Sequence, residues 1–212
     1  MTDIILVRHG ETEWNVGKIF RGRKDIPLNE MGRKQAELLG KYLSEVRVDA
    51  IYSSPLKRAL DTANLIAKYQ PEKIDVQVTE GLLDINYGEW EGRSEQEVNE
   101  LYPELYELWN KSPHEVLIPK GESLAAVRER ALSAVNEIVS KYKGNVALVS
   151  HRVVNKVLTC ALLGLDNSHF WNIRQDVGGV TIFSYEDNRF ILTKHNDTSY
   201  LKEIQKYVLG DF

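Results

Sequence analysis

The sequence has a single cysteine, Cys160, among its 212 residues, so no intrachain disulfide is possible. That cysteine lies in an apolar stretch with helical spacing, which is typical of a buried, unreactive thiol. No run of about 18 consecutive apolar residues occurs, and no basic segment with a long apolar one opens the chain. These absences predict a protein with no membrane span and no membrane partner, and the cytoplasm is the expected compartment.

An excess of basic residues is also lacking. The 27 Lys and Arg residues face 31 Asp and Glu residues, which gives a formal charge of -4 at pH 7. Nucleic-acid-binding domains usually carry a basic balance or a basic stripe, so no nucleic-acid partner is expected. His114, His169 and His195 lie in separate contexts without ligand spacing, and no paired aspartate motif for Mg²⁺ occurs. The sequence therefore predicts no metal site and no cofactor.

Short apolar runs alternate with segments of helical periodicity along most of the chain. The runs are rich in β-branched residues and bounded by turn residues, which is typical of strands. Strands are expected at residues 4–7, 50–53, 74–78, 145–149, 179–185 and 189–194. Helices are expected at residues 30–46, 55–66, 95–101, 104–110, 124–142 and 153–163. This alternation predicts an α/β protein, a three-layer α/β/α sandwich with a mainly parallel sheet.

The composition changes between Gly81 and Gly121. Large aromatic residues concentrate there among glycine and proline, with two short helical stretches. We interpret residues 81–121 as a small inserted helical lobe that covers one end of the sheet. No repeat of solenoid length and no low-complexity linker occurs, so residues 1–212 are expected to form a single domain.

One local pattern occurs twice. Residues 4–9 (IILVRH) and 146–151 (VALVSH) each join a buried apolar run to a histidine. The carboxyl ends of parallel strands meet at one edge of a sheet, and adjacent strands at a switch point form a crevice there. We therefore expect His9 and His151 to face each other across one pocket.

Two arginines are expected at the same edge of the sheet. Arg8 precedes His9, and the strand at 50–53 delivers residues 54–58 (SPLKR), which brings Arg58 close. A single histidine after a strand, or a single arginine in a helix, is usually only a satisfied polar residue. Two histidines and two arginines at the same edge of the sheet indicate a functional site instead. Such a set suits a dianion, most simply a phosphoryl group.

These motifs, taken in order, resemble those of the histidine phosphatase superfamily, the phosphoglycerate mutase-like proteins. The matching segments are RHGET with Asn15, SSPLKRA with Thr62, YGEWEG, GES and VSH, which begin at positions 8, 53, 87, 121 and 149. The first motif alone is moderately specific, whereas the whole series in order is very specific. The resemblance covers residues 4–201 and implies a phosphoglycerate mutase-like fold and a cofactor-independent phosphatase of small molecules.

The resemblance also implies roles for individual residues. His9 would be the nucleophile that takes up the phosphoryl group as a phosphohistidine, and Gly10 would permit the tight turn that points it into the pocket. Four further side chains would bind the phosphoryl oxygens and offset their charge: Arg8, Asn15, Arg58 and His151.

A carboxyl group near the bridging oxygen is needed to protonate the leaving group. The family usually places a glutamate three residues before the Tyr-Gly step, whereas this sequence has Asp84 three residues before Tyr87. Aspartate is one methylene shorter but offers the same chemistry. We assign the general acid and base role to Asp84, with Glu80 as the rival carboxylate.

A second departure from the family pattern is Arg152, where relatives often carry glycine after the second histidine. A cation near the N-terminus of a helix is unfavourably placed against the helix dipole. That disadvantage favours a role in the pocket, such as binding an acidic group of the substrate. We expect Arg152 to bind substrate, together with Arg21 and Gly22 on the substrate-facing loop.

Other interpretations stay open at this point. A phosphoglycerate mutase-type phosphotransferase would use the same residues, but mutases tend to carry a larger insertion than residues 81–121, so hydrolysis is favoured. A non-catalytic phospholigand sensor would lack a catalytic side chain, and a metallohydrolase would need histidines at ligand spacing. The partner is expected to be a small phosphomonoester of unidentified structure. The hairpin strand near Ile191 leaves a homodimer open.

Overall fold

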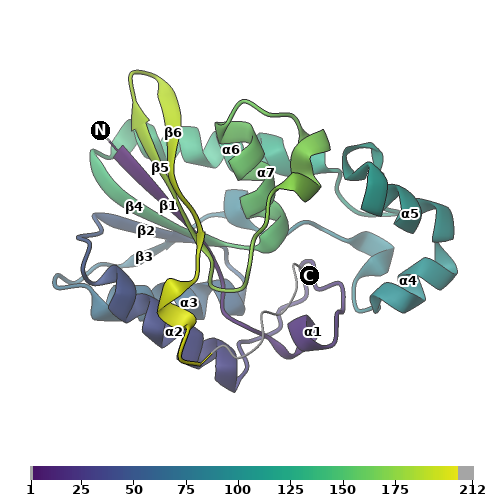
Figure 1. Ribbon diagram of the computed structural model, residues 1–212, viewed down its shortest axis with the longest axis horizontal. Coiled ribbons are helices and arrows are strands. Elements are labelled where there is room, and N and C mark those ends of the chain that lie inside the picture. The colour runs from purple at the N-terminus through teal and green to yellow at the C-terminus, as the bar shows by residue number, and fades with distance from the viewer. Residues whose placement is uncertain (1, 205–212) are drawn as a thin grey trace.

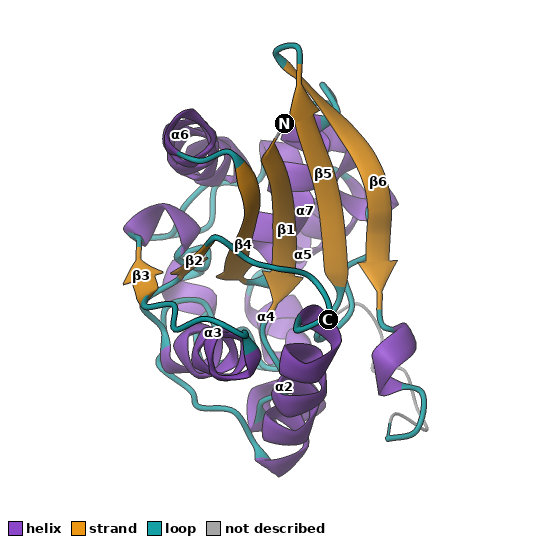
Figure 2. Cartoon of the chain, turned by 90° about the vertical axis from the view of Figure 1, so that its left-hand side faces the viewer, coloured by secondary structure: helices purple, strands orange, loops and turns teal. Residues whose placement is uncertain are grey.

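A six-stranded sheet forms the centre of the molecule (Figure 1, Figure 2). The computed structural model describes residues 2–204 of the chain. The strand order is β3-β2-β4-β1-β5-β6. The first four strands are parallel to one another, β5 is antiparallel to β1, and β6 is antiparallel to β5. The strands are β1 (Thr2–Arg8), β2 (Ala50–Ser53), β3 (Val76–Val78), β4 (Gly144–Ser150), β5 (Val180–Glu186) and β6 (Arg189–Asp197). The sheet is therefore mainly parallel, as predicted.

Helices cover both faces of the sheet (Figure 2). Four helices make up the two outer layers: α2 (Glu30–Leu43), α3 (Lys57–Tyr69), α6 (Leu124–Lys141) and α7 (Arg152–Leu162). Alternate residues of β1 point to opposite layers, so that Ile5 and Val7 pack with α2 and α3, while Ile4 and Leu6 pack with α6 and α7. Both layers bury apolar side chains along one helical stripe, which is the main stabilising contribution in such a sandwich. The predicted three-layer α/β/α arrangement is confirmed.

The boundaries of α2 and α3 differ from those expected. α2 begins at Glu30 as predicted, where the Asn29 side chain accepts a hydrogen bond from the Gly32 amide, but the helix ends at Leu43 rather than at Val46. Val46 is exposed, so a helix extended to this residue would bury little further apolar surface. Pro55 lies before α3, not in its first turn, because the backbone is still extended at Leu56.

The remaining sheet boundaries also shift slightly. β3 begins at Val76 rather than at residue 74, and β6 continues to Asp197 rather than ending at residue 194. The hairpin turn between β5 and β6 places Asp187 and Asn188 at φ 49° and 59°. A two-residue turn with positive φ at both positions matches the twist of the flanking strands, and Asp and Asn tolerate that conformation better than most residues.

The segment between β3 and α6 holds short helices rather than strands. They are η1 (Glu80–Leu82), η2 (Gly88–Trp90), α4 (Glu95–Leu101), α5 (Pro103–Lys111) and η3 (Pro113–Glu115). α4 and α5 lie beside the sheet, at the right of Figure 1. The three further helical segments are α1 (Glu13–Val16), η4 (Asn167–Asn172) and η5 (Ser199–Leu201), none of which the sequence patterns indicated.

Aromatic side chains form the core of this segment. Trp90 and Trp109 are buried with ring centroids 6.1 Å apart, and Trp109 also packs on Phe170 of η4 at 5.6 Å. Edge-to-face and tilted contacts of this kind stabilise aromatic clusters beyond the area that they bury. The aromatic residues that mark this stretch of sequence therefore hold the lobe to the body of the molecule.

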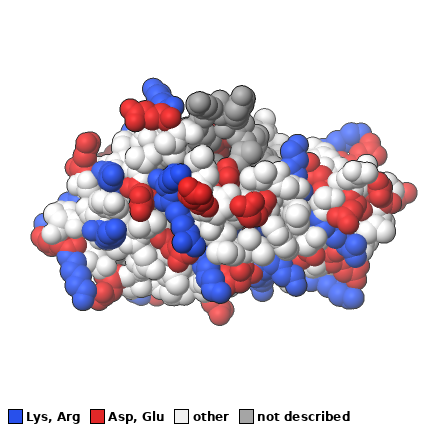
Figure 3. All heavy atoms as spheres, turned by 90° about the horizontal axis from the view of Figure 1, so that it is seen from below, with Lys and Arg blue, Asp and Glu red and all other residues white. Residues whose placement is uncertain are grey.

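The surface carries both signs of charge. Acidic and basic side chains are interspersed over the face drawn in Figure 3, in keeping with the small net charge of the chain. Within residues 2–204, no helix combines the length and apolar character needed to cross a bilayer.

Candidate active site

The two histidines of the repeated pattern lie side by side. β1 and β4 are neighbouring parallel strands with Arg8 opposite Ser150, so the next residue of each strand reaches the same edge of the sheet. The His9 amide donates to the Ser150 carbonyl at 3.1 Å, and the imidazole centroids of His9 and His151 are 5.2 Å apart. Both side chains are buried. The pairing register of two strands therefore builds the centre of the site.

A backbone hydrogen bond fixes which nitrogen of His9 can react. His9 Nδ1 lies 2.6 Å from the carbonyl oxygen of Gly10. A carbonyl oxygen only accepts, so Nδ1 must carry the proton and Nε2 keeps its lone pair. Burial, and then the charges of Arg58, Arg8 and Arg21, hold the pKa of His9 well below its usual value. The imidazole is therefore neutral near pH 7, and Nε2 is available as a nucleophile.

His151 is held from two sides. Its Nε2 lies 2.8 Å from the Ser54 hydroxyl oxygen, and its Nδ1 lies 3.7 Å from Asp84 Oδ2. Burial, followed by the charges of Arg58 and His9, also lowers the pKa of His151 well below its usual value. A neutral imidazole at this point can donate one hydrogen bond to an incoming anion without repelling the neighbouring arginines.

Arg58 is held by several hydrogen bonds. Its side chain is fully buried and donates to the carbonyl oxygens of Gly22 and Lys24, each at 2.8 Å, and to Asp84 Oδ2 at 3.0 Å. Burial lowers the pKa of Arg58, and the nearby Asp84 carboxylate opposes that shift. These contacts fix the plane of the guanidinium, which is the geometry needed to bind phosphoryl oxygens.

Arg8 reaches the same edge from the end of β1. Its side chain is fully buried, and Nη1 donates to the Gln175 carbonyl at 2.5 Å. The loop after η4 therefore holds this guanidinium in place. The structure thus brings Arg8, Arg58, His9 and His151 together, as their positions at strand ends led us to expect.

Asp84 is a buried carboxylate that lies beside His151. Its side chain is buried beside Arg58 and His151, and Oδ1 also accepts the amide of Ile85 at 3.0 Å. Glu80, the rival candidate, is exposed in η1. The geometry therefore favours Asp84 as the group that exchanges a proton with a leaving group.

The loop after β1 contributes through both side chains and backbone. Asn15 Oδ1 accepts from Thr12, and its buried Nδ2 has no hydrogen-bond partner within residues 2–204. Buried Arg21 donates to the Trp14 carbonyl at 3.2 Å, and burial with the charges of Arg8 and Arg58 lowers its pKa. These two predicted substrate ligands therefore lie at or near the cationic cluster.

Gly22 acts through its backbone. Its φ of 49° suits glycine, and a Cβ added there would lie 2.2 Å from Glu91 Oε1. Its carbonyl oxygen accepts from Arg58. The structure thus shows that Gly22 shapes the loop and holds Arg58, and its expected contact with substrate stays a prediction.

Arg152 is the first residue of α7 and turns inward. It is 5% exposed, its Cζ lies 5.8 Å from the Trp171 ring centroid, and it acts electrostatically on Arg21 and Tyr87. Arg152 is therefore buried, and its expected contact with substrate stays a prediction.

The sequence did not indicate the residue that supports the Asp84 loop. Arg130 of α6 donates hydrogen bonds to three backbone carbonyl oxygens of that loop, those of Gly81, Leu83 and Asp84, at 2.7–3.1 Å. Its guanidinium also pairs with Glu122 at 3.1 Å, and Glu122 accepts the amide of Asn86 at 2.8 Å. A polar residue on an amphipathic helix is normally solvated, so no local signal distinguished Arg130.

We expect Arg130→Met to lower turnover of alkyl phosphates by roughly 10- to 100-fold, because a loosened loop misplaces the proton donor. Hydrolysis of p-nitrophenyl phosphate, whose phenolate departs without a proton, should fall less. Steady-state kinetics on both substrates check this result, with Arg130→Lys as a partial rescue and Arg189→Gln, on the distant hairpin, as the matched control. Equal losses on both substrates would show that Arg130 does not act through Asp84.

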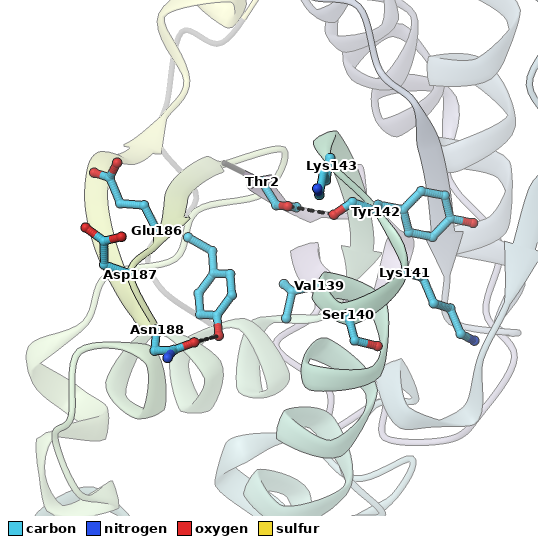
Figure 4. A pocket seen from close by; sticks show the side chains of 10 residues that line it. Thr2, Val139, Ser140, Lys141, Tyr142, Lys143, Glu186, Asp187 and Asn188 are labelled. Atoms are coloured by element: carbon cyan, nitrogen blue, oxygen red, sulfur yellow. Dashed lines mark hydrogen bonds between the residues drawn. The ribbon is translucent and has the colours of Figure 1, made fainter.

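A hollow of about 570 Å³ lies at the other end of the sheet (Figure 4). It is lined by the start of β1, the end of α6 and the β5–β6 turn, and includes Thr2, Lys143 and Glu186. The Thr2 hydroxyl donates to the Tyr142 carbonyl at 2.7 Å across its wall. No histidine or arginine lines this hollow, so it lacks the groups that gather around His9. Across residues 2–204, no three His, Cys, Asp or Glu side chains cluster as metal ligands would.

The fold and the geometry of the site together define a class of protein. Two neutral imidazoles, a cationic surround and one carboxylate lie beyond the carboxyl ends of parallel strands. This arrangement suits phosphoryl transfer through a histidine. The comparisons agree: a model of the histidine phosphatase superfamily (branch 1) matches residues 4–198, and the chain belongs to that family.

Named relatives are similar over nearly the whole chain. Phosphoserine phosphatase 1 of Hydrogenobacter thermophilus is 39% identical over 204 residues, which is 96% of each chain. The metal-independent phosphoserine phosphatase of Arabidopsis thaliana is 34% identical over 209 residues, 96% of this chain and 85% of that protein. The solved phosphoserine phosphatase of Entamoeba histolytica, in complex with 3-phosphoglyceric acid, matches with a TM-score of 0.85 at 30% identity, over 95% of this chain and 100% of that one. The resemblance drawn from the motifs is confirmed.

Proposed function

We propose that this protein hydrolyses small phosphomonoesters without a metal ion, through a phosphohistidine formed on Nε2 of His9. The observation that carries the proposal is the hydrogen bond from Nδ1 to the Gly10 carbonyl, which leaves Nε2 unprotonated beside the buried guanidinium groups of Arg8 and Arg58. Fixed cations can offset the charge of a phosphoryl group in the way that a metal ion does in other phosphatases.

In the first step, His9 Nε2 attacks phosphorus, the P–N bond forms, and the bond from phosphorus to the ester oxygen breaks. Asp84, in its protonated form, gives its proton to the departing oxygen. Arg8, Arg58 and His151 bind the three phosphoryl oxygens, with Asn15 Nδ2 as a further donor. The hydrogen bond to Gly10 stabilises the positive charge that develops on the His9 ring.

In the second step, water attacks the phosphohistidine. Asp84, now a carboxylate, accepts a proton from the water as the O–P bond forms and the P–N bond breaks. His9 returns to its neutral form, phosphate leaves, and the protonated Asp84 is ready for the next cycle. One carboxyl group therefore serves both half-reactions.

O-phosphoserine is the substrate that we propose first. The two curated relatives described above are phosphoserine phosphatases, and both are similar over 96% of this chain. The site is compatible with such a substrate because Arg21 and Arg152 are buried as well as Arg8 and Arg58, and the charges of the other three act on Arg21. A phosphoglycerate mutase-type reaction would use the same residues, and the names of these relatives favour hydrolysis over it.

The test compares phosphate release with isomerisation. We expect the protein to release phosphate from O-phosphoserine at an undiminished rate in excess EDTA. With 3-phosphoglycerate and a bisphosphorylated glycerate primer, the rate of 2-phosphoglycerate formation should stay below about 1% of the hydrolytic rate, because nothing in the proposed cycle retains the first product. Coupled assays measure both reactions. Loss of activity in EDTA, restored by a divalent cation, or isomerisation faster than hydrolysis would refute this function.

A further inference from the structure

The hydroxyl group of Ser54 is buried beside the ring of His151. Ser54 follows the last residue of β2, and its amide donates to the Val149 carbonyl of β4 at 3.0 Å. Because β2 and β4 are neighbouring parallel strands, this hydrogen bond places Ser54 beside the residues that lead into His151. Ser54 Oγ then lies 2.8 Å from His151 Nε2. The backbone of the sheet therefore fixes the hydroxyl group relative to the imidazole.

The other hydrogen bond of this hydroxyl group shows which atom carries the shared proton. Ser54 Oγ accepts the Leu56 amide at 3.4 Å, and within residues 2–204 its only further partner is His151 Nε2. If Nε2 carried the proton, the hydroxyl proton of Ser54 would be buried without an acceptor, which is unfavourable in a protein interior. The Ser54 hydroxyl therefore donates to Nε2, and Nε2 accepts.

The opposite side of the His151 ring supports the same assignment. Burial, and then the charge of Arg58, lower the pKa of His151 well below its usual value, so the ring is neutral near pH 7 and carries a single N–H. With Nε2 as the acceptor, that N–H is at Nδ1, which lies 3.7 Å from Asp84 Oδ2. The same oxygen accepts a hydrogen bond from Arg58 at 3.0 Å. An N–H is attracted to this oxygen, whereas a lone pair on Nδ1 would be repelled by it.

The two imidazoles of the site are thus held in opposite ways. Both carry their proton on Nδ1, but the Gly10 carbonyl accepts from Nδ1 of His9 and leaves Nε2 as a nucleophile. Ser54 instead donates to Nε2 of His151 and leaves Nδ1–H as a donor. Nδ1 of His151 is buried and has no hydrogen-bond partner within residues 2–204, and its ring lies 5.2 Å from that of His9. An acceptor oxygen bound beside His9 would satisfy this N–H.

We infer that Ser54 is a positioning residue that selects the tautomer of His151, an inference that rests on the proposed transfer of a phosphoryl group to His9. In the Nδ1–H tautomer, His151 donates a hydrogen bond to a non-bridging phosphoryl oxygen, and this donor needs no rearrangement when the transition state forms. In the other tautomer, Nδ1 would present a lone pair to that oxygen and repel it. Ser54 acts through His151 and does not touch the substrate. Its effect is therefore expected on the phosphoryl group and not on the leaving group.

NMR spectroscopy reads the tautomer of His151 directly. In protein labelled with ¹⁵N at histidine, two-bond ¹H–¹⁵N correlations distinguish Nδ1–H from Nε2–H, and the signals that are lost in His151→Gln assign the ring. We expect Nδ1–H for His151 in the ligand-free protein. In Ser54→Ala the Nε2 signal should move toward that of a protonated nitrogen. Ser53→Ala removes the neighbouring buried hydroxyl, which donates to the Ser54 carbonyl at 2.9 Å, and should leave the His151 signals unchanged.

Kinetics then test whether the tautomer matters for turnover. For Ser54→Ala we expect kcat/KM to fall roughly 30-fold on O-phosphoserine and on p-nitrophenyl phosphate alike, because the lost interaction is with a non-bridging oxygen. Inhibition by vanadate, whose oxygens resemble those of the transferring phosphoryl group, should weaken by a similar factor. Ser54→Thr keeps the hydroxyl group and should recover part of the activity. Ser53→Ala should stay within about threefold of the unmodified protein on both substrates.

The two measurements separate the role of Ser54 from the proposed function. An Nε2–H tautomer of His151 in the unmodified protein would overturn the inference, because Ser54 would then be the acceptor. Unchanged His151 signals in Ser54→Ala, shown to be folded by thermal melts, would overturn it too, as would a loss of activity confined to O-phosphoserine. If the unmodified protein hydrolysed neither ester, the proposed function would fail, whereas the spectrum of the ligand-free protein would still decide which tautomer Ser54 selects.

Discussion

Replacing His9 with alanine is expected to abolish phosphoester hydrolysis and covalent capture of phosphate together. The variant loses the atom that forms the P–N bond, and no other nucleophile in the described site has its geometry, because His151 Nε2 already contacts the Ser54 hydroxyl. Removal of the nucleophile from a covalent mechanism typically costs at least about 10⁴-fold in turnover. We expect kcat to fall by that amount on every phosphomonoester, whatever its leaving group.

Rapid mixing with ³²P-labelled substrate and quenching in base measures the intermediate directly. Label should appear on the unmodified protein, survive base and be lost in acid, and peptide mapping should place it on His9. His9→Ala should carry none, although its buried arginines should still bind inorganic phosphate or vanadate. His114→Ala changes an exposed histidine and is the matched control, with full labelling expected. Label of normal amount in His9→Ala would show that another residue is the nucleophile.

The sequence predicted the centre of this site because strand patterns carry long-range information. The two runs that end in His9 and His151 are apolar on both faces, which places them inside a parallel sheet, and the ends of such strands share an edge. The observed register, with Arg8 opposite Ser150, follows from that arrangement. Arg58 was found by the same reasoning, since β2 is the other neighbour of β4.

Contacts made between helices and loops could not be predicted in this way. Arg130 holds the Asp84 loop from 46 positions away in the chain, and nothing in its local pattern differs from a solvated helix residue. Glu122 was singled out only as part of a motif, whereas the structure shows that it joins Arg130 to the Asn86 amide. Such contacts depend on how α6 packs against the segment after β3, and periodicity reports only which face of a helix is buried.

The role of Gly22 illustrates the same limit. Its place in the loop suggested contact with substrate, which stays a prediction, and only the three-dimensional structure shows that its carbonyl holds Arg58 and that its lack of a Cβ leaves room for Glu91. Sequence patterns locate residues near a site. Whether a residue acts through its side chain or its backbone is decided by tertiary geometry.

The Asp84→Asn variant is expected to lose both roles of the carboxyl group, the acid of the first step and the base of the second. Substrates with different leaving groups should tell the two losses apart. The amide cannot give a proton to the departing oxygen, so O-phosphoserine, which leaves as an alkoxide, should lose roughly 10³-fold in kcat. p-Nitrophenyl phosphate needs no proton for the first step, and its phosphohistidine should form almost normally. The second step still lacks its base, so the intermediate should accumulate in the variant.

Burst kinetics measure this accumulation. With p-nitrophenyl phosphate, Asp84→Asn should release one equivalent of p-nitrophenol quickly and then turn over slowly, while Glu80→Gln, which changes the exposed rival carboxylate, should behave as the unmodified protein. The stability of the Asp84→Asn variant must be measured as well, because the substitution removes the charge that faces the buried Arg58. Breaking a buried ion pair costs about 3 kcal/mol or more of unfolding free energy, which denaturant titration detects. A variant that stays folded yet shows no burst and equal losses on both esters would exclude Asp84 as the acid and base, and a burst in Glu80→Gln would transfer that role to Glu80.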